Sequence, residues 1–335
     1  MEHTNFSYSE PTQPLVQQMA IRAVERLTGQ PELKRLYELN RAQPVMGESF
    51  WHAAVRLLEL NISLDHAALE SIPKTGPLVV VANHPYGVLD GIAICWLMEK
   101  VRKDFLVLTH AALLRAPEAR PYLLPVDFSG TAEATAANLD TRKRARAHLD
   151  QGGAIVVFPA GAISTSPDRF GQKPATDWPW QPFTAQLIQR SRAPVVPVFF
   201  HGQNSRLFQV ASHVSSTLRL ALIFKEVRDR IGSSLDISIG APLSPDQIAR
   251  FPDRGALTEF LRQKTYALEA KIHQGPSSNS WSNTQRPGKI LNHCHCRHKL
   301  KPASLSALVF ILGFTKGQHS FCWAKPSTFC GQRGN

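Results

Sequence analysis

The chain has 335 residues and a formal net charge of +12, from 38 Lys or Arg against 26 Asp or Glu. A chain of this length can bury a sizeable core and normally holds one large or two modest domains. Residues 276–335 contain eight Lys or Arg and no Asp or Glu, so residues 1–275 are nearly balanced in charge. This distribution argues against a nucleic-acid-binding protein.

Two helical stretches are predicted ahead of the first strand, at about residues 12–29 and 30–60. They define an N-terminal helical segment, residues 1–74. The polar stretch 2–13 is not typical of a signal peptide. Cys95 is the single cysteine of residues 1–275, which is typical of a reducing compartment. We therefore expect a cytoplasmic protein.

The first predicted strand, residues 78–82, is apolar throughout and should be buried on both faces. It is followed by His84, which Pro85 keeps away from helical backbone angles. Ligand sites of open α/β sheets lie at the carboxyl ends of their strands. His84 is therefore expected at such a site, with Asp90 near the start of the next helix at about 91–100.

His84 and Asp90 are the residue types of a general base and its orienting carboxylate. An imidazole can accept a proton from a hydroxyl when a carboxylate holds its other nitrogen and stabilises the imidazolium. The chain between them must fold back, which Gly87 would allow. The alternative interpretation is that Asp90 caps its helix and His84 is a polar turn residue.

The remaining pattern alternates strands and helices. Strands are predicted near 104–109, 122–128, 153–158, 194–200 and 234–240. Helices are predicted near 132–150, 181–192 and 253–273. Such alternation favours an α/β fold with a mostly parallel sheet flanked by helices, which we assign to residues 75–274.

Two further strands end in polar loops. Residues 154–158 are followed by Pro159, Gly161 and Ser164, and residues 193–200 by His201. Three segments, in this order along the chain, resemble the glycerol-phosphate and lysophospholipid acyltransferase family. The first block, residues 79–91, is similar to that family's Asn-His-x4-Asp motif. The second block, residues 154–164, is similar to its Phe-Pro-Glu-Gly-Thr-Arg-Ser motif, and the third, residues 193–202, to its Val-Pro-Val motif. The resemblance covers about residues 75–245. His84 and Asp90 are separated by one residue more than in the family motif. In this spacing the chain resembles a hemolysin-related bacterial branch of the family.

The resemblance implies an O-acyltransferase that moves a fatty acyl group from acyl-CoA or acyl carrier protein to a hydroxyl of a lysophospholipid or related lipid acceptor. It implies catalysis by His84 and Asp90, no cofactor or metal, and a location at the inner face of the membrane. The sequence lacks a Gly-x-Ser-x-Gly nucleophile motif, which agrees with direct transfer. The substrate-binding residues implied are Gly87, Phe158, Pro159, Gly161 and Ser164.

The second block departs from the family pattern. Ala160, Ala162 and Ile163 stand where the family has glutamate, threonine and arginine, which help to hold the acceptor's phosphate or glycerol. A phosphate would need other cations, for which Arg206 is the first candidate and Lys173 the second. Either residue could instead be a solvated surface charge. Two other functions stay open: a non-catalytic lipid-binding protein, and an acyltransferase for a non-phosphate acceptor such as a lipidated amino acid.

Residues 275–335 form a tail of unusual composition, with four of the five cysteines and no acidic residue. We expect this tail to be disordered or aberrant, outside the folded domain. Its Cys-His cluster at 294–298 lacks the second half of a zinc-finger pattern. Its apolar stretch at 304–314 is too short to span a bilayer.

Overall fold

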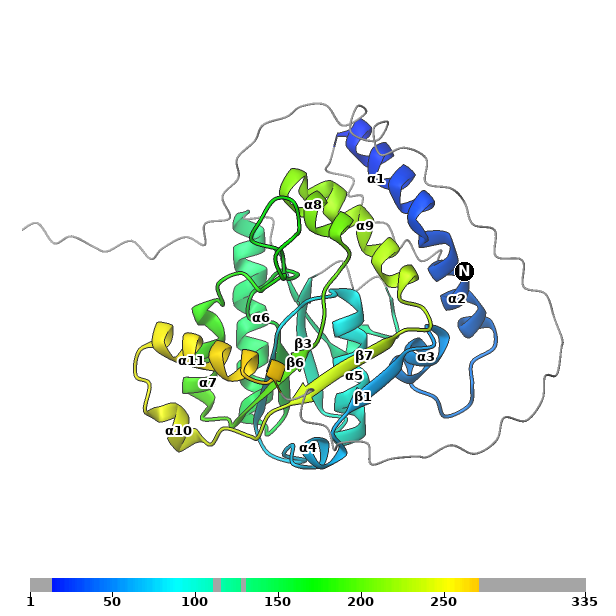
Figure 1. The fold of residues 1–335 in the computed structure, drawn as a ribbon. Helices are drawn as coiled ribbons and strands as arrows, with labels where there is room; N and C mark the ends of the chain where they lie inside the picture. The colour runs from blue at the N-terminus through cyan, green and yellow to red at the C-terminus, as the bar shows by residue number, and fades with distance from the viewer. Residues whose placement is uncertain (1–13, 111–115, 128–130, 271–335) are drawn as a thin grey trace, which may run out of the picture. The chain divides into compact units, whose positions relative to one another are not determined.

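The structure is a computed structural model that describes residues 14–110, 116–127 and 131–270 (Figure 1). The tail predicted at 275–335, with its Cys-His cluster, lies outside the described residues. The helices, in chain order, are α1 Leu15–Thr28, α2 Gln30–Ala42, α3 Phe50–Leu57, α4 His66–Glu70, α5 Val88–Val101, the 3₁₀ helix η2 Arg120–Tyr122, α6 Ala132–Asp150, α7 Pro182–Ser191, α8 Arg206–Val214, α9 Ser216–Asp229, α10 Pro245–Ala249 and α11 Arg254–Tyr266.

One seven-stranded sheet runs through the domain in the order β1-β7-β6-β2-β5-β3-β4. Neighbouring strands are parallel except β6 and β7, which are antiparallel. The α/β fold with a mostly parallel sheet is therefore confirmed. The strands are β1 Asn61–Leu64, β2 Leu78–Ala82, β3 Phe105–His110, β4 Leu123–Val126, β5 Ala154–Val157, β6 Val195–Phe200 and β7 Ser234–Ile239.

The N-terminal segment differs from its prediction in two places. The helix expected at 30–60 is two helices, because α2 ends at Ala42 and α3 begins after Ser49, whose side chain accepts a hydrogen bond from the His52 N–H. Pro44 and Gly47 lie between them and disfavour a continuous helix. Residues 61–64, expected outside the sheet, form β1 and pair with β7.

Helices α8, α9 and α10 follow β6 and β7 and were not predicted. Ser205 and Ser215 cap α8 and α9 through their side-chain oxygens, and Ser244 caps α10. Ser is a favoured N-cap residue because its oxygen satisfies a free N–H of the first turn. α9 packs against α1, so the N-terminal helices and the α8–α9 pair lie together (Figure 1).

The core has two layers, one on each face of the sheet. Alternate residues of β2 separate cleanly, since Leu78, Val80 and Ala82 belong to one layer and Val79 and Val81 to the other. This period of two is what a strand buried on both faces requires. The first layer includes residues of α3, α5 and α9, and the second includes residues of α6, α7 and α11.

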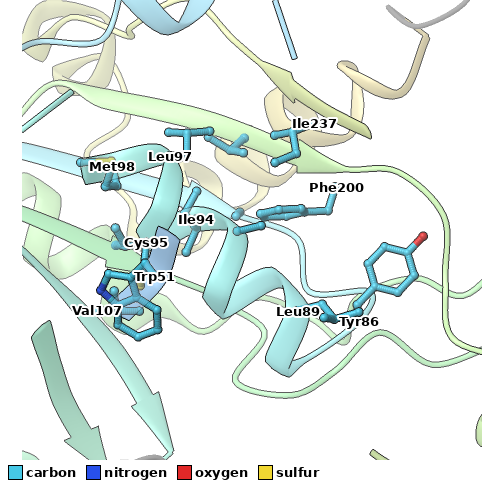
Figure 2. Packing of buried hydrophobic residues seen from close by; sticks show 14 of the residues in the cluster. Trp51, Tyr86, Leu89, Ile94, Cys95, Leu97, Met98, Val107, Phe200 and Ile237 are labelled. Carbon is cyan, nitrogen blue, oxygen red and sulfur yellow. The ribbon is translucent and has the colours of Figure 1, made fainter. Parts of the chain in front are cut away.

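Helix α5 covers the centre of the first layer. Figure 2 shows Ile94 and Leu97 of α5 in one cluster with Phe200 of β6 and Ile237 of β7. Leu89 and Tyr86 extend this cluster to the N-terminal end of α5. The packing fixes the start of α5 against the sheet, and therefore fixes the turn that joins β2 to α5.

None of the helices in the described ranges is long and apolar enough to cross a membrane.

Candidate active site

The turn after β2 lies at the centre of the sheet, where β2 is flanked by β5 and β6. Asn83 joins two of these strands, since its amide donates to the Phe200 carbonyl at 2.9 Å and accepts from the Phe200 N–H at 2.7 Å. The carboxyl ends of parallel strands meet at one edge of a sheet, where ligands of α/β proteins bind. His84 is thereby held at that edge.

His84 and Asp90 meet across the turn. His84 Nδ1 lies 3.0 Å from Asp90 Oδ2, and the same oxygen accepts hydrogen bonds from the N–H groups of Tyr86 at 2.8 Å and Gly87 at 2.9 Å. Asp90 is the third residue of α5 and is fully buried. It therefore caps its helix and contacts the histidine at the same time, so the two interpretations of this residue are not alternatives.

The Asp90 carboxyl faces Nδ1 of the His84 imidazole. Burial raises the pKa of the Asp90 carboxyl. The interaction with His84 and the hydrogen bonds from the Tyr86 and Gly87 N–H groups oppose that rise. The Nδ1–H is poorly aligned with Oδ2 despite the short distance, and such catalytic contacts commonly tighten when substrate binds. With Nδ1 protonated toward Asp90, Nε2 is the proton acceptor.

The loop after β5 packs against this histidine. The Phe158 ring lies over the His84 ring, with centroids 4.1 Å apart and planes inclined by 31°. The Pro159 carbonyl accepts a hydrogen bond from the Gln181 N–H at the start of α7. Gly161, at a positive φ, is exposed and donates its N–H to the Phe158 carbonyl. Of these predicted residues, the structure brings Phe158 into direct contact with the His84 ring.

Gly87 lies where the turn after β2 faces the loop after β5. Its φ of +76° with ψ of −108° is a backbone conformation that residues with a Cβ avoid. A Cβ at this position would lie 2.6 Å from Ile163 Cδ1. The Ser164 N–H donates to the His84 carbonyl at 2.8 Å, so a backbone hydrogen bond also joins the loop after β5 to the turn after β2.

Asp177 is a buried part of the site that the sequence patterns did not indicate. Its carboxylate accepts hydrogen bonds from the His84 N–H at 3.1 Å, the Ser164 hydroxyl at 2.5 Å and Trp180 Nε1 at 2.8 Å. Burial raises the pKa of this carboxyl as well. Ser164 is 1% exposed, and its hydroxyl proton is directed at Asp177. A substrate contact by Ser164 stays a prediction.

The cation that contacts the second block is not one of the two predicted cations. Arg206 begins α8, is exposed, and donates from Nε to the Phe170 carbonyl at 2.9 Å. Lys173 is also exposed. In contrast, Arg219 of α9 donates from Nη2 to the Ile163 carbonyl. Since α9 was not predicted, no signal in the sequence placed Arg219 near the second block.

Comparison with known proteins assigns the class of protein that this fold and site define. The acyltransferase family model matches residues 16–275. The chain therefore belongs to the acyltransferase family, and it is an acyltransferase.

The individual relatives have low sequence identity to this chain. The lyso-glycine lipid O-acyltransferase of Phocaeicola vulgatus is 23% identical over 230 residues, which cover 67% of this chain and 78% of that protein. Its namesake from Bacteroides thetaiotaomicron is 24% identical over 239 residues, covering 69% and 83%. The crystal structure of the 1-acyl-sn-glycerophosphate acyltransferase PlsC from Thermotoga maritima has a TM-score of 0.43 and 18% identity, covering 78% of this chain and 89% of that chain.

Proposed function

We propose that this acyltransferase moves a fatty acyl group from an acyl thioester, acyl-CoA or acyl carrier protein, to a hydroxyl of a lysolipid. The observation that carries the proposal is the 3.0 Å contact between His84 Nδ1 and the buried Asp90 carboxylate at the carboxyl end of β2. A buried carboxylate that holds one imidazole nitrogen prepares the other to act as a general base.

In the proposed reaction, His84 Nε2 removes the proton of the acceptor hydroxyl as its oxygen attacks the thioester carbonyl. The tetrahedral intermediate collapses with cleavage of the C–S bond, and the departing sulfur takes the proton from the imidazolium. An ester and a free thiol result. General-base assistance supplies about 10²- to 10⁴-fold, so positioning of the two substrates supplies much of the remaining acceleration.

The acceptor is proposed to carry an amino-acid head group in preference to a glycerol phosphate. Ala160, Ala162 and Ile163 give the second block no charged side chain, and two relatives are named for a lyso-glycine lipid. A lysophospholipid is the alternative acceptor, with the phosphate held by cations outside the block, such as Arg206. A non-catalytic lipid-binding role is less well supported, because lipid binding alone does not require a histidine paired with a buried carboxylate.

The enzyme is further proposed to work at the inner face of the membrane without spanning it. Helix α1 exposes four large apolar side chains, and it also exposes Arg22 and Arg26. An amphipathic helix of this kind binds at the lipid interface. The exposed apolar residues are Leu15, Val16, Met19 and Leu27, each at least 70% exposed.

The test is an acyl-transfer screen with the full chain. Labelled acyl-CoA and acyl carrier protein serve as donors to lysophospholipids, lyso-glycine lipid and monoacylglycerol, in vesicles, with products identified by mass. We expect an O-acylated lysolipid from the wild type and none from His84→Ala. If no donor and acceptor pair gives product while the protein still binds vesicles, the non-catalytic role replaces this proposal.

A further inference from the structure

Arg219 places a guanidinium beside the loop after β5. It donates a hydrogen bond to the Ile163 carbonyl, and its guanidinium carbon lies 5.6 Å from the centroid of the buried Phe208 ring. Burial lowers the pKa of this guanidinium to about 10. That value is still far above neutral pH, so the group carries its positive charge.

This charge is not neutralised by a protein carboxylate in the part of the chain that the structure describes. Some other arginines there have acidic partners, as Arg102 has Asp104 and Arg228 has Asp229. For Arg219, burial is the cause of the lowered pKa, with no acidic group opposing it. A partly buried cation without a counter-charge is costly, and an anionic ligand would remove that cost.

One peptide group links Arg219 to the catalytic histidine. The Ile163 carbonyl accepts from Arg219, and the Ser164 N–H, at the other end of the same planar group, donates to the His84 carbonyl. Arg219 therefore lies one rigid peptide unit away from the backbone of the base. An anion bound by Arg219 would therefore lie on the far side of this peptide group from the His84 carbonyl.

The second block, residues 154–164, offers no charged side chain of its own. Its positions Ala160, Ala162 and Ile163 are uncharged, and the hydroxyl proton of Ser164 is directed at Asp177. A guanidinium presents five N–H donors in a planar fork that matches the paired oxygens of a carboxylate or phosphate. Arg219 uses one of these donors on Ile163.

We propose that Arg219 binds the anionic head group of the acyl acceptor, a carboxylate or a phosphate, and so determines which lysolipids are acylated. This inference rests on the proposed function. Arg206, which was predicted from sequence for this task, bonds instead to Phe170 from an exposed position.

The experiment compares three acceptors that share chain length and hydroxyl but carry a carboxylate, a phosphate or an uncharged head group. Arg219→Gln, Arg219→Lys and Arg206→Gln are measured beside wild type, with Arg228→Gln as a matched control on the same helix. For Arg219→Gln we expect the KM of each anionic acceptor that the wild type uses to rise about tenfold or more. The KM of the neutral acceptor and of the donor should not change, and Arg219→Lys should lie between wild type and Arg219→Gln.

Three results would overturn the inference. The first is an unchanged KM for anionic acceptors, and the second is a selective rise in Arg206→Gln in place of Arg219→Gln. The third is an equal loss of kcat with all three acceptors, which would show that Arg219 only supports the 163–164 peptide. If Arg219→Gln does not fold, the wild type decides, because equal KM values for neutral and anionic acceptors exclude an anion site. A wild type that acylates no lysolipid contradicts the proposed function instead.

Discussion

The turn after β2 and the loop after β5 both follow buried parallel strands, but they are stabilised in different ways. Asp90 takes its hydrogen bonds from within the turn, from residues at most six positions away. The loop after β5 depends on distant groups, since Ser164 bonds to Asp177, Ser166 to Gln209 and Ile163 to Arg219. The contacts that hold the Asp90 carboxylate are therefore local, whereas the side-chain contacts of the second region come from the rest of the fold.

The largest expected effect of this contrast is on turnover. His84→Ala should lower kcat by at least about 10²- to 10⁴-fold, because it removes the general base. Its melting temperature should stay close to wild type, since the side chain is 19% exposed and lies at a strand end. Exposed His66 on α4 provides the control, and His66→Ala should keep full activity. Near wild-type turnover by purified His84→Ala would remove the base assignment.

Changes at Asp90 should separate its two roles. Asp90→Asn keeps an oxygen for the Tyr86 and Gly87 N–H groups but loses the charge that stabilises the imidazolium, so kcat should fall less than in His84→Ala while stability is nearly kept. Asp90→Ala leaves two buried N–H groups without an acceptor, which should cost about 1–3 kcal/mol each in the free energy of unfolding. Denaturant titration and kinetics check both variants. Equal stability of the Asn and Ala variants would contradict the capping role.

The raised pKa of Asp90 adds a dependence on pH. Because the folded pKa exceeds the ordinary value of 3.8, the folded state binds the proton more tightly than the unfolded state. This contribution to stability is present below the unfolded pKa and is lost as pH rises through the folded pKa. Asp177 contributes with the same sign. Asp90→Asn should therefore flatten the acid side of the stability profile in part, and an unchanged profile would argue against the shift.

A substitution at Gly87, in the turn after β2, should displace Ile163 in the loop after β5. Gly87→Ala introduces a Cβ at positive φ, which should cost about 1–3 kcal/mol of stability, and it pushes on Ile163. Removing Cδ1 with Ile163→Val in the same chain should recover the steric part of the loss but not the backbone part. A double-mutant cycle by thermal unfolding measures the coupling. Additive effects would show that the two loops do not press on each other.

The smallest effect is expected at Ser164. Its hydroxyl donates to buried Asp177, so Ser164→Ala should cost about 1 kcal/mol of stability and change the acceptor KM little. A rise in acceptor KM at constant stability would instead favour the substrate contact predicted for this residue from the family resemblance.

The contrast between local and distant contacts also explains which secondary-structure elements and site residues can be predicted from the sequence. The strand at 78–82 and the helix at 132–150 were predicted within a residue, because the strand is a continuous apolar run and the helix is 19 residues long. β1 has four residues with alternating partial exposure, too weak a pattern to recognise. His84 and Asp90 could be paired because both lie in one turn. Asp177 lies 93 residues from His84, so only the assembled fold brings them together.

The amide of Asn83 has a consequence for when the enzyme becomes active. It bonds to Phe200, which is 117 residues further along the chain, and thereby holds the catalytic turn to a strand that is synthesised much later. Closing so long a loop is slow, and contacts of high sequence separation delay folding. A nascent chain that ends before β6 has its histidine and aspartate but lacks this support. Activity should therefore appear in the last folding phase, after secondary structure has formed.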